Sequence, residues 1–119
     1  LYGNEGFDTL TGGTGADTFQ FSLGDSANAN PDVISDFQHL TDILELQDID
    51  AKQSTASVNE MLTFIGTSAF TLGVEGQVRY FTSGGSTFVE INTNGDALAD
   101  MTIRLDNTTL ALSAADFIL

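Results

Sequence analysis

Two adjacent segments of the chain carry the same pattern of glycines and oxygen-bearing side chains. Residues 3–11 read GNEGFDTLT and residues 12–20 read GGTGADTFQ, with glycine or asparagine at the first, second and fourth places. Glycine, and asparagine next best, tolerates positive φ, so each segment can curl tightly and turn carbonyl oxygens inward. Asp8 and Asp17, at the sixth places, each add a charged oxygen. Carbonyl and carboxylate oxygens are the ligands that calcium prefers.

Each curl is expected to be a turn followed by a short strand. We name residues 3–8 the first half-cage and residues 12–17 the second half-cage. The eighth residue of each unit, Leu10 or Phe19, is large and apolar and is expected to point into the interior. A pair of glycine-rich hairpin turns without metal would give a similar pattern. Two copies in phase, in a strongly acidic chain, favour calcium.

Composition narrows the choice of partners. The 119 residues are 41% hydrophobic, which suits one domain with an apolar core. Three Lys and Arg residues oppose 17 carboxylates, and the net charge of -14 disfavours nucleic acid and anionic membranes. Without cysteine there is no disulfide and no Cys-ligated metal. No apolar run approaches the roughly 20 residues needed for membrane insertion.

The doubled pattern resembles the calcium-binding nonapeptide of the RTX (repeats-in-toxin) family. This resemblance implies a right-handed parallel β-roll in which each nonapeptide is half a coil. Loops that are two nonapeptides apart would then stack, and one ion between them would take ligands from both.

Counting two nonapeptides forward predicts how the roll ends. Two nonapeptides after the first half-cage lies a loop that has lost most of the pattern. Its Gly24 matches Gly6, but Asp25 stands one place before the position that matches Asp8. From the second half-cage the count reaches Asp32, without glycines, and Phe37 stands two nonapeptides after Phe19, which predicts one more rung around residues 33–37. The candidate metal ligands are Gly3, Glu5, Gly6, Asp8, Gly12, Thr14, Gly15, Asp17, Asp25 and Asp32. For Asp25, Asp32 and Asp36 a solvated turn carboxylate stays open as the alternative.

The rest of the chain reads as strands and turns. A short strand is expected at residues 43–46 and a helical turn at residues 55–62. Further β-rich runs, with a turn at Ser83–Ser86, predict an antiparallel meander; they are residues 62–65, 78–82, 87–92 and 101–105. The predicted fold is all-β: a short right-handed parallel β-roll in residues 1–37 that continues into an antiparallel β-sandwich-like part in residues 38–119, as one continuous domain.

Other candidate sites are weaker. Residues 92–100 place oxygen side chains in an order that echoes an acyclic calcium loop, but Asn94-Gly95 is also a strong two-residue hairpin signal, and we favour the turn. His39 has no partner for a zinc site and is expected to be a solvent-facing loop residue. We identify no Ser-His-Asp or Cys-His set and no marked carboxylate pair, so catalysis is not predicted.

The whole pattern resembles the C-terminal domain of serralysin-type secreted proteins. The resemblance rests on the nonapeptides and on residues 32–37, 94–100, 103–105 and 113–119. It implies an enzymatic or adhesive domain upstream in the same chain, which fits a sequence that begins in mid-motif. It also implies export by type I secretion machinery through a C-terminal signal, an acidic residue followed by apolar ones, here residues 116–119. A last strand or helix turn packed on the sandwich is the compatible alternative.

These observations predict a non-catalytic calcium-binding C-terminal module of a larger secreted protein, which folds on extracellular calcium and carries a type I secretion signal. The alternative is an accessory module of a polysaccharide-modifying enzyme that helps to hold a glycan through calcium. The scarcity of Lys and Arg argues against strong contacts with an anionic glycan.

Overall fold

The computed structural model describes residues 1–55, 60–106 and 109–119, and these form an all-β fold, as predicted. No α-helix occurs among these residues, and none of their helical turns is long and apolar enough to cross a membrane. The strands are β1 (Thr9–Leu10), β2 (Thr18–Gln20), β3 (Asp32–Ile34), β4 (Ile43–Glu45), β5 (Thr63–Phe64), β6 (Gln77–Ser83), β7 (Ser86–Asn92), β8 (Met101–Leu105) and β9 (Phe117–Ile118); the 3-10 turns are η1 (Gln53–Thr55) and η2 (Ala114–Asp116).

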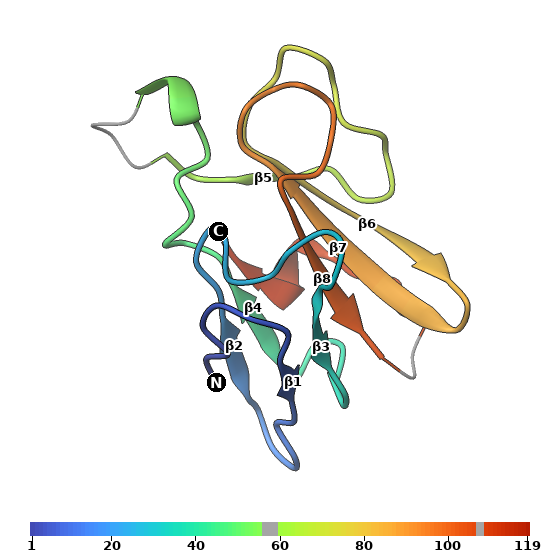
Figure 1. Ribbon diagram of the computed structural model, residues 1–119. Coiled ribbons are helices and arrows are strands. Elements are labelled where there is room, and N and C mark those ends of the chain that lie inside the picture. The colour runs from blue at the N-terminus through green and yellow to red at the C-terminus, as the bar shows by residue number, and fades with distance from the viewer. Residues whose placement is uncertain (56–59, 107–108) are drawn as a thin grey trace.

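The strands form two sheets, and the roll is divided between them. The smaller sheet is parallel throughout, in the order β2-β4-β9, and the larger has the order β1-β3-β8-β7-β6-β5. In the larger sheet β1, β3 and β8 are parallel, so the chain coils between the two sheets from β1 to β4. Figure 1 shows these short blue to green strands at one end of the molecule and the long orange hairpin beside them. Parallel pairing runs past residue 37, and the division of the chain there stays a prediction.

The expected period of two nonapeptides holds only once. Tyr2 forms a bridge with Gln20, which occupies the position two nonapeptides later. The next coils are longer, because Thr9 pairs with Val33 and Phe19 pairs with Leu44. The rung predicted around residues 33–37 is present as β3, but its register is wrong, because the loops after β2 and β3 lengthen each coil and Phe19 pairs with Leu44 instead of Phe37. Phe37 is nevertheless buried and packs against Phe19, with ring centroids 6.2 Å apart.

The meander is antiparallel as predicted over β6, β7 and β8. Gly84 and Gly85 connect β6 to β7 with φ of 57° and 82°, the positive values of a tight hairpin turn. β5 differs from the expectation, because it pairs with β6 in parallel. Asn94-Gly95 is not a two-residue hairpin: β7 ends at Asn92 and β8 begins at Met101, so a longer loop connects them.

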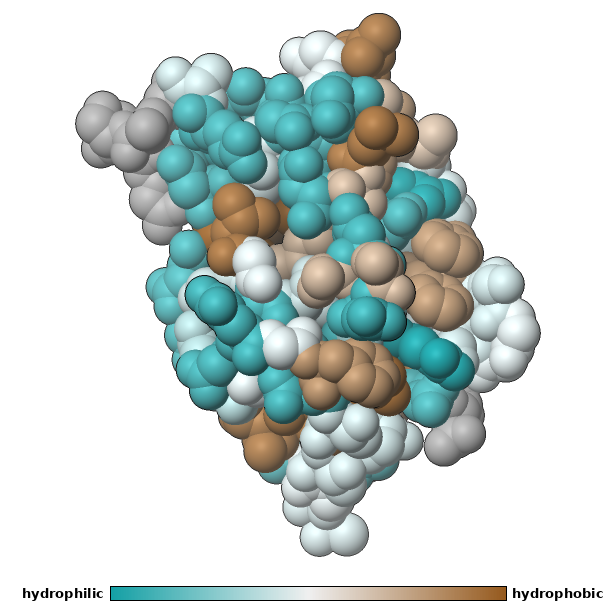
Figure 2. Space-filling model, viewed as in Figure 1, coloured by the Kyte–Doolittle hydropathy of each residue, from teal (hydrophilic) through white to brown (hydrophobic). Residues whose placement is uncertain are grey.

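One apolar core lies between the sheets. Phe19, Leu44 and Phe117 enter it from the smaller sheet, and Ile91 and Ile103 from the larger, all at most 7% exposed. Phe19 thus points inward as predicted, and Leu10 is partly buried against the same core. In Figure 2 the visible apolar residues form separate small groups, while the tip between β1 and β2, at the bottom of the view in Figure 1, is pale. The roll therefore presents its glycine-rich end to solvent.

The predicted helical turn at residues 55–62 falls largely on residues 56–59, which lie outside the described residues. Just before them, η1 ends at Thr55.

Candidate metal centre

The glycines of the half-cages serve two different purposes. As expected, the second and fourth places have positive φ: Asn4 at 66°, Gly6 at 142°, Gly13 at 89° and Gly15 at 106°. The first places do not share this conformation, so the expectation of positive φ there is corrected. Gly3 and Gly12 provide space instead, because a Cβ on either would press against the aspartate of its own loop.

In the first half-cage two carboxylates meet above Gly3. One oxygen of Asp32, Oδ1, accepts a hydrogen bond of 2.9 Å from the Asp8 amide. The other oxygen of Asp32 and Oδ2 of Asp8 are buried and have no hydrogen-bond partner. These two oxygens lie 3.0 and 3.3 Å from the Cβ position of Gly3, so both face the same small space. Two unpartnered buried carboxylate oxygens facing one space are an arrangement that a cation would stabilise.

The electrostatics of Asp32 point the same way. Burial raises the pKa of this carboxyl, and the charges of Asp8 and Asp25 raise it further, against the opposing hydrogen bond from the Asp8 amide. The ionised form of Asp32 is therefore disfavoured where it stands, and a nearby positive charge would favour it.

The second half-cage is more completely satisfied by the protein itself. Asp17 Oδ2 is buried without a partner, and it lies 2.6 Å from the Cβ position of Gly12. The Asp17 amide donates to Asp42 Oδ1 at 3.0 Å, and the second oxygen of Asp42 accepts from the Gln38 amide at 2.8 Å. Asp36 accepts from the amides of Gly12 and Gly13 at 2.9 and 2.7 Å. Among the described residues, one buried carboxylate oxygen without a partner lies here, compared with two at the first half-cage.

The aspartate of the repeat persists on the next rungs although the glycines do not. Asp32 immediately precedes the residue that pairs with Thr9, as Asp8 precedes Thr9. Asp42 likewise precedes Ile43, the partner of Thr18, as Asp17 precedes Thr18. Each later aspartate accepts the amide of the earlier one. The nonapeptide count related Asp32 to the second half-cage, whereas Asp32 stacks on the first. The count also missed Asp42. The signal that could have found both is an aspartate directly before each short strand.

The remaining candidate ligands are not among the unpartnered carboxylate oxygens. Asp25 is buried, but its carboxylate closes a turn by accepting from the Ser22 amide at 2.7 Å. Gly24 does not stack on Gly6, because Gly6 forms its bridge with Ser26. Glu5 and Thr14 are exposed at the third places of the two curls.

The residues present suit an oxygen-coordinated cation. Within the described residues five buried side-chain polar atoms lack a partner, and the three oxygens among them belong to Asp8, Asp17 and Asp32. Over the same residues no three His, Cys, Asp or Glu side chains converge on one point. Two carboxylates and backbone carbonyls would therefore have to complete the coordination, as the curled loops allow.

The other two sequence candidates take structural roles. In the loop after β7, Asn92 Oδ1 accepts from the amides of Asn94 and Gly95, and Asp100 accepts from the Thr93 amide at 2.7 Å. These hydrogen bonds stabilise a loop longer than the two-residue hairpin that the sequence favoured. His39 differs from the expectation of a solvent-facing residue: its side chain is 30% exposed, and Nδ1 lies 2.9 Å from the buried carboxylate of Asp116.

Comparison with known families gives a match over nearly the whole chain. The family model described as Peptidase M10 serralysin C terminal matches residues 2–119. No curated protein matches the chain.

Proposed function

The chain belongs to the serralysin C-terminal family of the M10 peptidases, and from this premise we propose that it is the calcium-binding, non-catalytic C-terminal module of a larger secreted protein, which folds on extracellular calcium. The family implies a calcium-binding RTX module of a secreted protein, with the catalytic domain elsewhere. The observation that carries the proposal for this chain is the pair of unpartnered oxygens of Asp8 and Asp32 above Gly3.

The two half-cages would hold calcium through different sets of residues. In the first, Asp8 and Asp32 supply carboxylate oxygens, and the curl supplies backbone carbonyl oxygens at Gly3, Glu5 and Gly6. In the second, Asp17 supplies the carboxylate, and the backbone carbonyls come from Gly12, Thr14 and Gly15. Asp36 and Asp42 orient the second loop by accepting its amides. When bound, calcium supplies positive charge between carboxylates that otherwise repel one another.

Charge and mass action make calcium a folding switch. The chain has a net charge of -14, so compaction without cations brings many carboxylates together. Calcium is scarce inside the cell, where the chain would remain unfolded during export. Outside, a site with a Kd of about 0.1 mM in millimolar calcium would stabilise the fold by on the order of 1.4 kcal/mol. Two such sites would shift a marginal fold decisively.

The proposed secretion signal, residues 116–119, is read before folding. In the folded protein Asp116 and Phe117 are buried, and β9 pairs with β4. Deletion of residues 116–119 should abolish the secreted fraction in cells that carry a type I secretion system. His39→Ala is the matched control, because it leaves the four residues intact and removes one of their folded-state contacts. Normal secretion of the deletion variant would contradict the signal assignment.

A calcium titration followed by circular dichroism tests the proposed function. The wild-type chain should gain β structure between chelator and millimolar calcium, and Asp8→Asn should shift the midpoint to higher calcium. Asp48→Asn is the control, because this exposed carboxylate lies outside both half-cages and accepts from the Gln20 side chain. An unchanged wild-type spectrum would reject the folding switch, and a shift in the control as large as in Asp8→Asn would reject the assigned ligand.

The glycan-binding alternative has less support. Both arginines are already in ion pairs, Arg79 with Glu90 and Arg104 with Asp106, so neither offers an uncompensated charge to an anionic sugar. Titration with an oligosaccharide, with and without calcium, would distinguish the two functions.

A further inference from the structure

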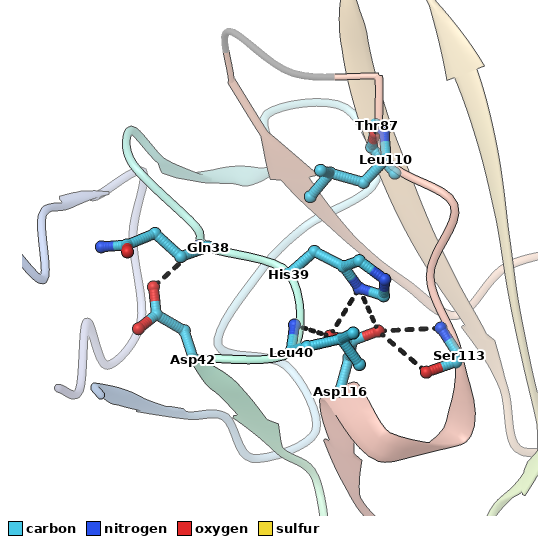
Figure 3. A network of polar contacts seen from close by, with 8 residues as sticks. All are labelled: Gln38, His39, Leu40, Asp42, Thr87, Leu110, Ser113 and Asp116. Atoms are coloured by element: carbon cyan, nitrogen blue, oxygen red, sulfur yellow. Dashed lines mark hydrogen bonds and ion pairs between the residues drawn. The ribbon is translucent and has the colours of Figure 1, made fainter. Parts of the chain in front are cut away.

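The C-terminal segment is anchored to the loop behind the second half-cage through one carboxylate. Asp116 is fully buried. It accepts hydrogen bonds from the amides of Leu40 and Ser113 at 2.9 and 2.8 Å, and from His39 Nδ1 at 2.9 Å. Figure 3 shows this carboxylate between the loop that carries His39 and Leu40 and the turn that begins at Ser113. These bonds outweigh the effect of burial, which alone would raise the pKa of Asp116, and hold that pKa below its ordinary value.

The anchored loop, residues 38–42, is the same loop that orients Asp17. Asp42 is buried and closes the loop, since its Oδ2 accepts from the Gln38 amide. Its Oδ1 accepts from the Asp17 amide in the second half-cage. A continuous series of hydrogen bonds therefore runs from Asp17 through Asp42 and the loop to Asp116.

The loop needs such an anchor because its backbone is strained. Leu40 has φ of 62°, a left-handed conformation that is unfavourable for a residue with a side chain. Its side chain is 66% exposed, so packing does not hold it there. The hydrogen bond from the Leu40 amide to Asp116 acts on the strained residue itself and opposes this strain.

We propose that Asp116 is a positioning residue for the second half-cage: by fixing the loop of residues 38–42, it couples cation binding at Asp17 to docking of the C-terminal segment on β4. The inference rests on the proposed function, since it concerns the same cation site. Coupling of this kind is reciprocal, so docking raises the affinity for calcium by the factor by which calcium favours docking. Calcium in the medium would then favour docking and burial of the C-terminal segment, and without calcium this segment would stay accessible.

The first test compares calcium midpoints. Asp116→Asn keeps the size of the side chain and removes its charge, and His39→Ala removes one donor without touching the core. We expect the midpoint of Asp116→Asn to rise on the order of tenfold and that of His39→Ala to rise less. Asp106→Asn is the matched control, a carboxylate that accepts from Ser86 and pairs with Arg104, away from this loop. Its midpoint should stay that of the wild type.

The second test reads docking directly in the full chain. The Leu46 amide donates to the carbonyl of Ile118 at 2.8 Å, so its hydrogen exchange reports whether β9 is docked. Raising calcium above the midpoint should slow the exchange of Leu46 in the wild type and much less in His39→Ala, while the amides of β7 should respond equally in both proteins. If His39 contributed only to general stability, His39→Ala would weaken the calcium response of Leu46 and of the β7 amides alike.

The outcomes separate the coupling from the proposed function. A wild-type chain that shows no response to calcium overturns the proposed function and the coupling with it. A normal calcium response, with unchanged midpoints in Asp116→Asn and His39→Ala, overturns the coupling alone. If Asp116→Asn does not fold in any calcium concentration, His39→Ala and the Leu46 exchange decide the matter.

Discussion

The roll and the antiparallel sheet of this molecule are held together in different ways. The strands β1 to β4 have two or three residues each, whereas β6 and β7 have seven and are paired along their whole length. The roll is also the acidic region: residues 1–50 hold ten of the 17 carboxylates and none of the three Lys and Arg residues. The ten are Glu5, Asp8, Asp17, Asp25, Asp32, Asp36, Asp42, Glu45, Asp48 and Asp50.

The difference teaches where each region obtains its stability. Long paired strands with alternating buried side chains, such as Val89 and Ile91 on β7, are stabilised by apolar burial and need no ion. Two-residue strands cannot offset the entropy of ordering the loops between them, and these loops also bring carboxylates together. The roll should therefore respond to calcium, and the antiparallel sheet only through the core that they share.

The largest effect should come from the core of the antiparallel sheet. Ile91→Ala removes a fully buried side chain and should cost about 2–5 kcal/mol in free energy of unfolding. Because no cation site is involved, the loss should be equal at two calcium concentrations that both exceed the midpoint. Urea unfolding measures it, and a loss that shrinks as calcium rises would contradict the separation of the two regions.

A crowded glycine of the roll should give the next largest effect. In Gly12→Ala the new Cβ would lie 2.6 Å from Asp17 Oδ2, so Asp17 must move, at a cost of about 1–3 kcal/mol. The calcium midpoint should rise as well. Gly13→Ala is the control for backbone strain, because Gly13 has φ of 89° and open space around its Cβ position. It should lower stability with a smaller rise in midpoint, and equal midpoints would show that the Gly12 contact does not matter.

Asp32→Asn should have effects of opposite sign with and without calcium. Asparagine keeps an oxygen for the Asp8 amide and removes a charge that faces Asp8. In chelator the variant should therefore hold more β structure than the wild type by circular dichroism. In saturating calcium it should be less stable to urea by about 1 kcal/mol, because a charged ligand is lost. A change of the same sign in both conditions would remove Asp32 from the site.

Much of the difference between the roll and the antiparallel sheet could be predicted from the sequence, because it depends on local patterns. The doubled nonapeptide predicted the curls and the buried Phe19, and the β-branched and aromatic runs predicted the meander. Asn4 and the glycines at the second and fourth places have the positive φ that the pattern requires. These features involve residues close together in the chain, where geometry follows from residue type.

What the sequence could not predict depends on loop length and on distant partners. Nothing in the doubled nonapeptide indicates that the next coils are longer than two such units, so Asp32 was related to the wrong half-cage and Asp42 was missed. The role of Asp116 could not be predicted either, because its partners His39 and Leu40 precede the whole meander in the sequence, whereas Asp116 follows it. Single carboxylates among 17 give no sign of which of them becomes buried.

The free energy of unfolding at acid pH should depend on Asp116, with a smaller effect than that of Asp32→Asn. Its pKa is held below the ordinary 3.8 by hydrogen bonds, so the ionised form stabilises the fold above that value. That contribution is lost as pH falls through the lowered pKa. The difference in unfolding free energy between wild type and Asp116→Asn should thus shrink as the pH falls below about 3.8. A difference that grows as the pH falls below 3.8 would contradict the direction of the shift.

The smallest effect should come from Leu40→Gly, and its sign is informative. Glycine relieves the left-handed backbone of Leu40, worth about 1–2 kcal/mol, but frees the unfolded chain at a cost of about 0.4–1 kcal/mol. The central values of these two ranges leave a net gain of just under about 1 kcal/mol, which melting in calcium should show. Leu72→Gly is the matched control, because Leu72 is also highly exposed and has no positive φ, and it should lose stability. In the Asp116→Asn background the gain should be larger, because the strained loop then lacks the hydrogen bond that held it. Equal gains in both backgrounds would mean that Asp116 does not hold the loop.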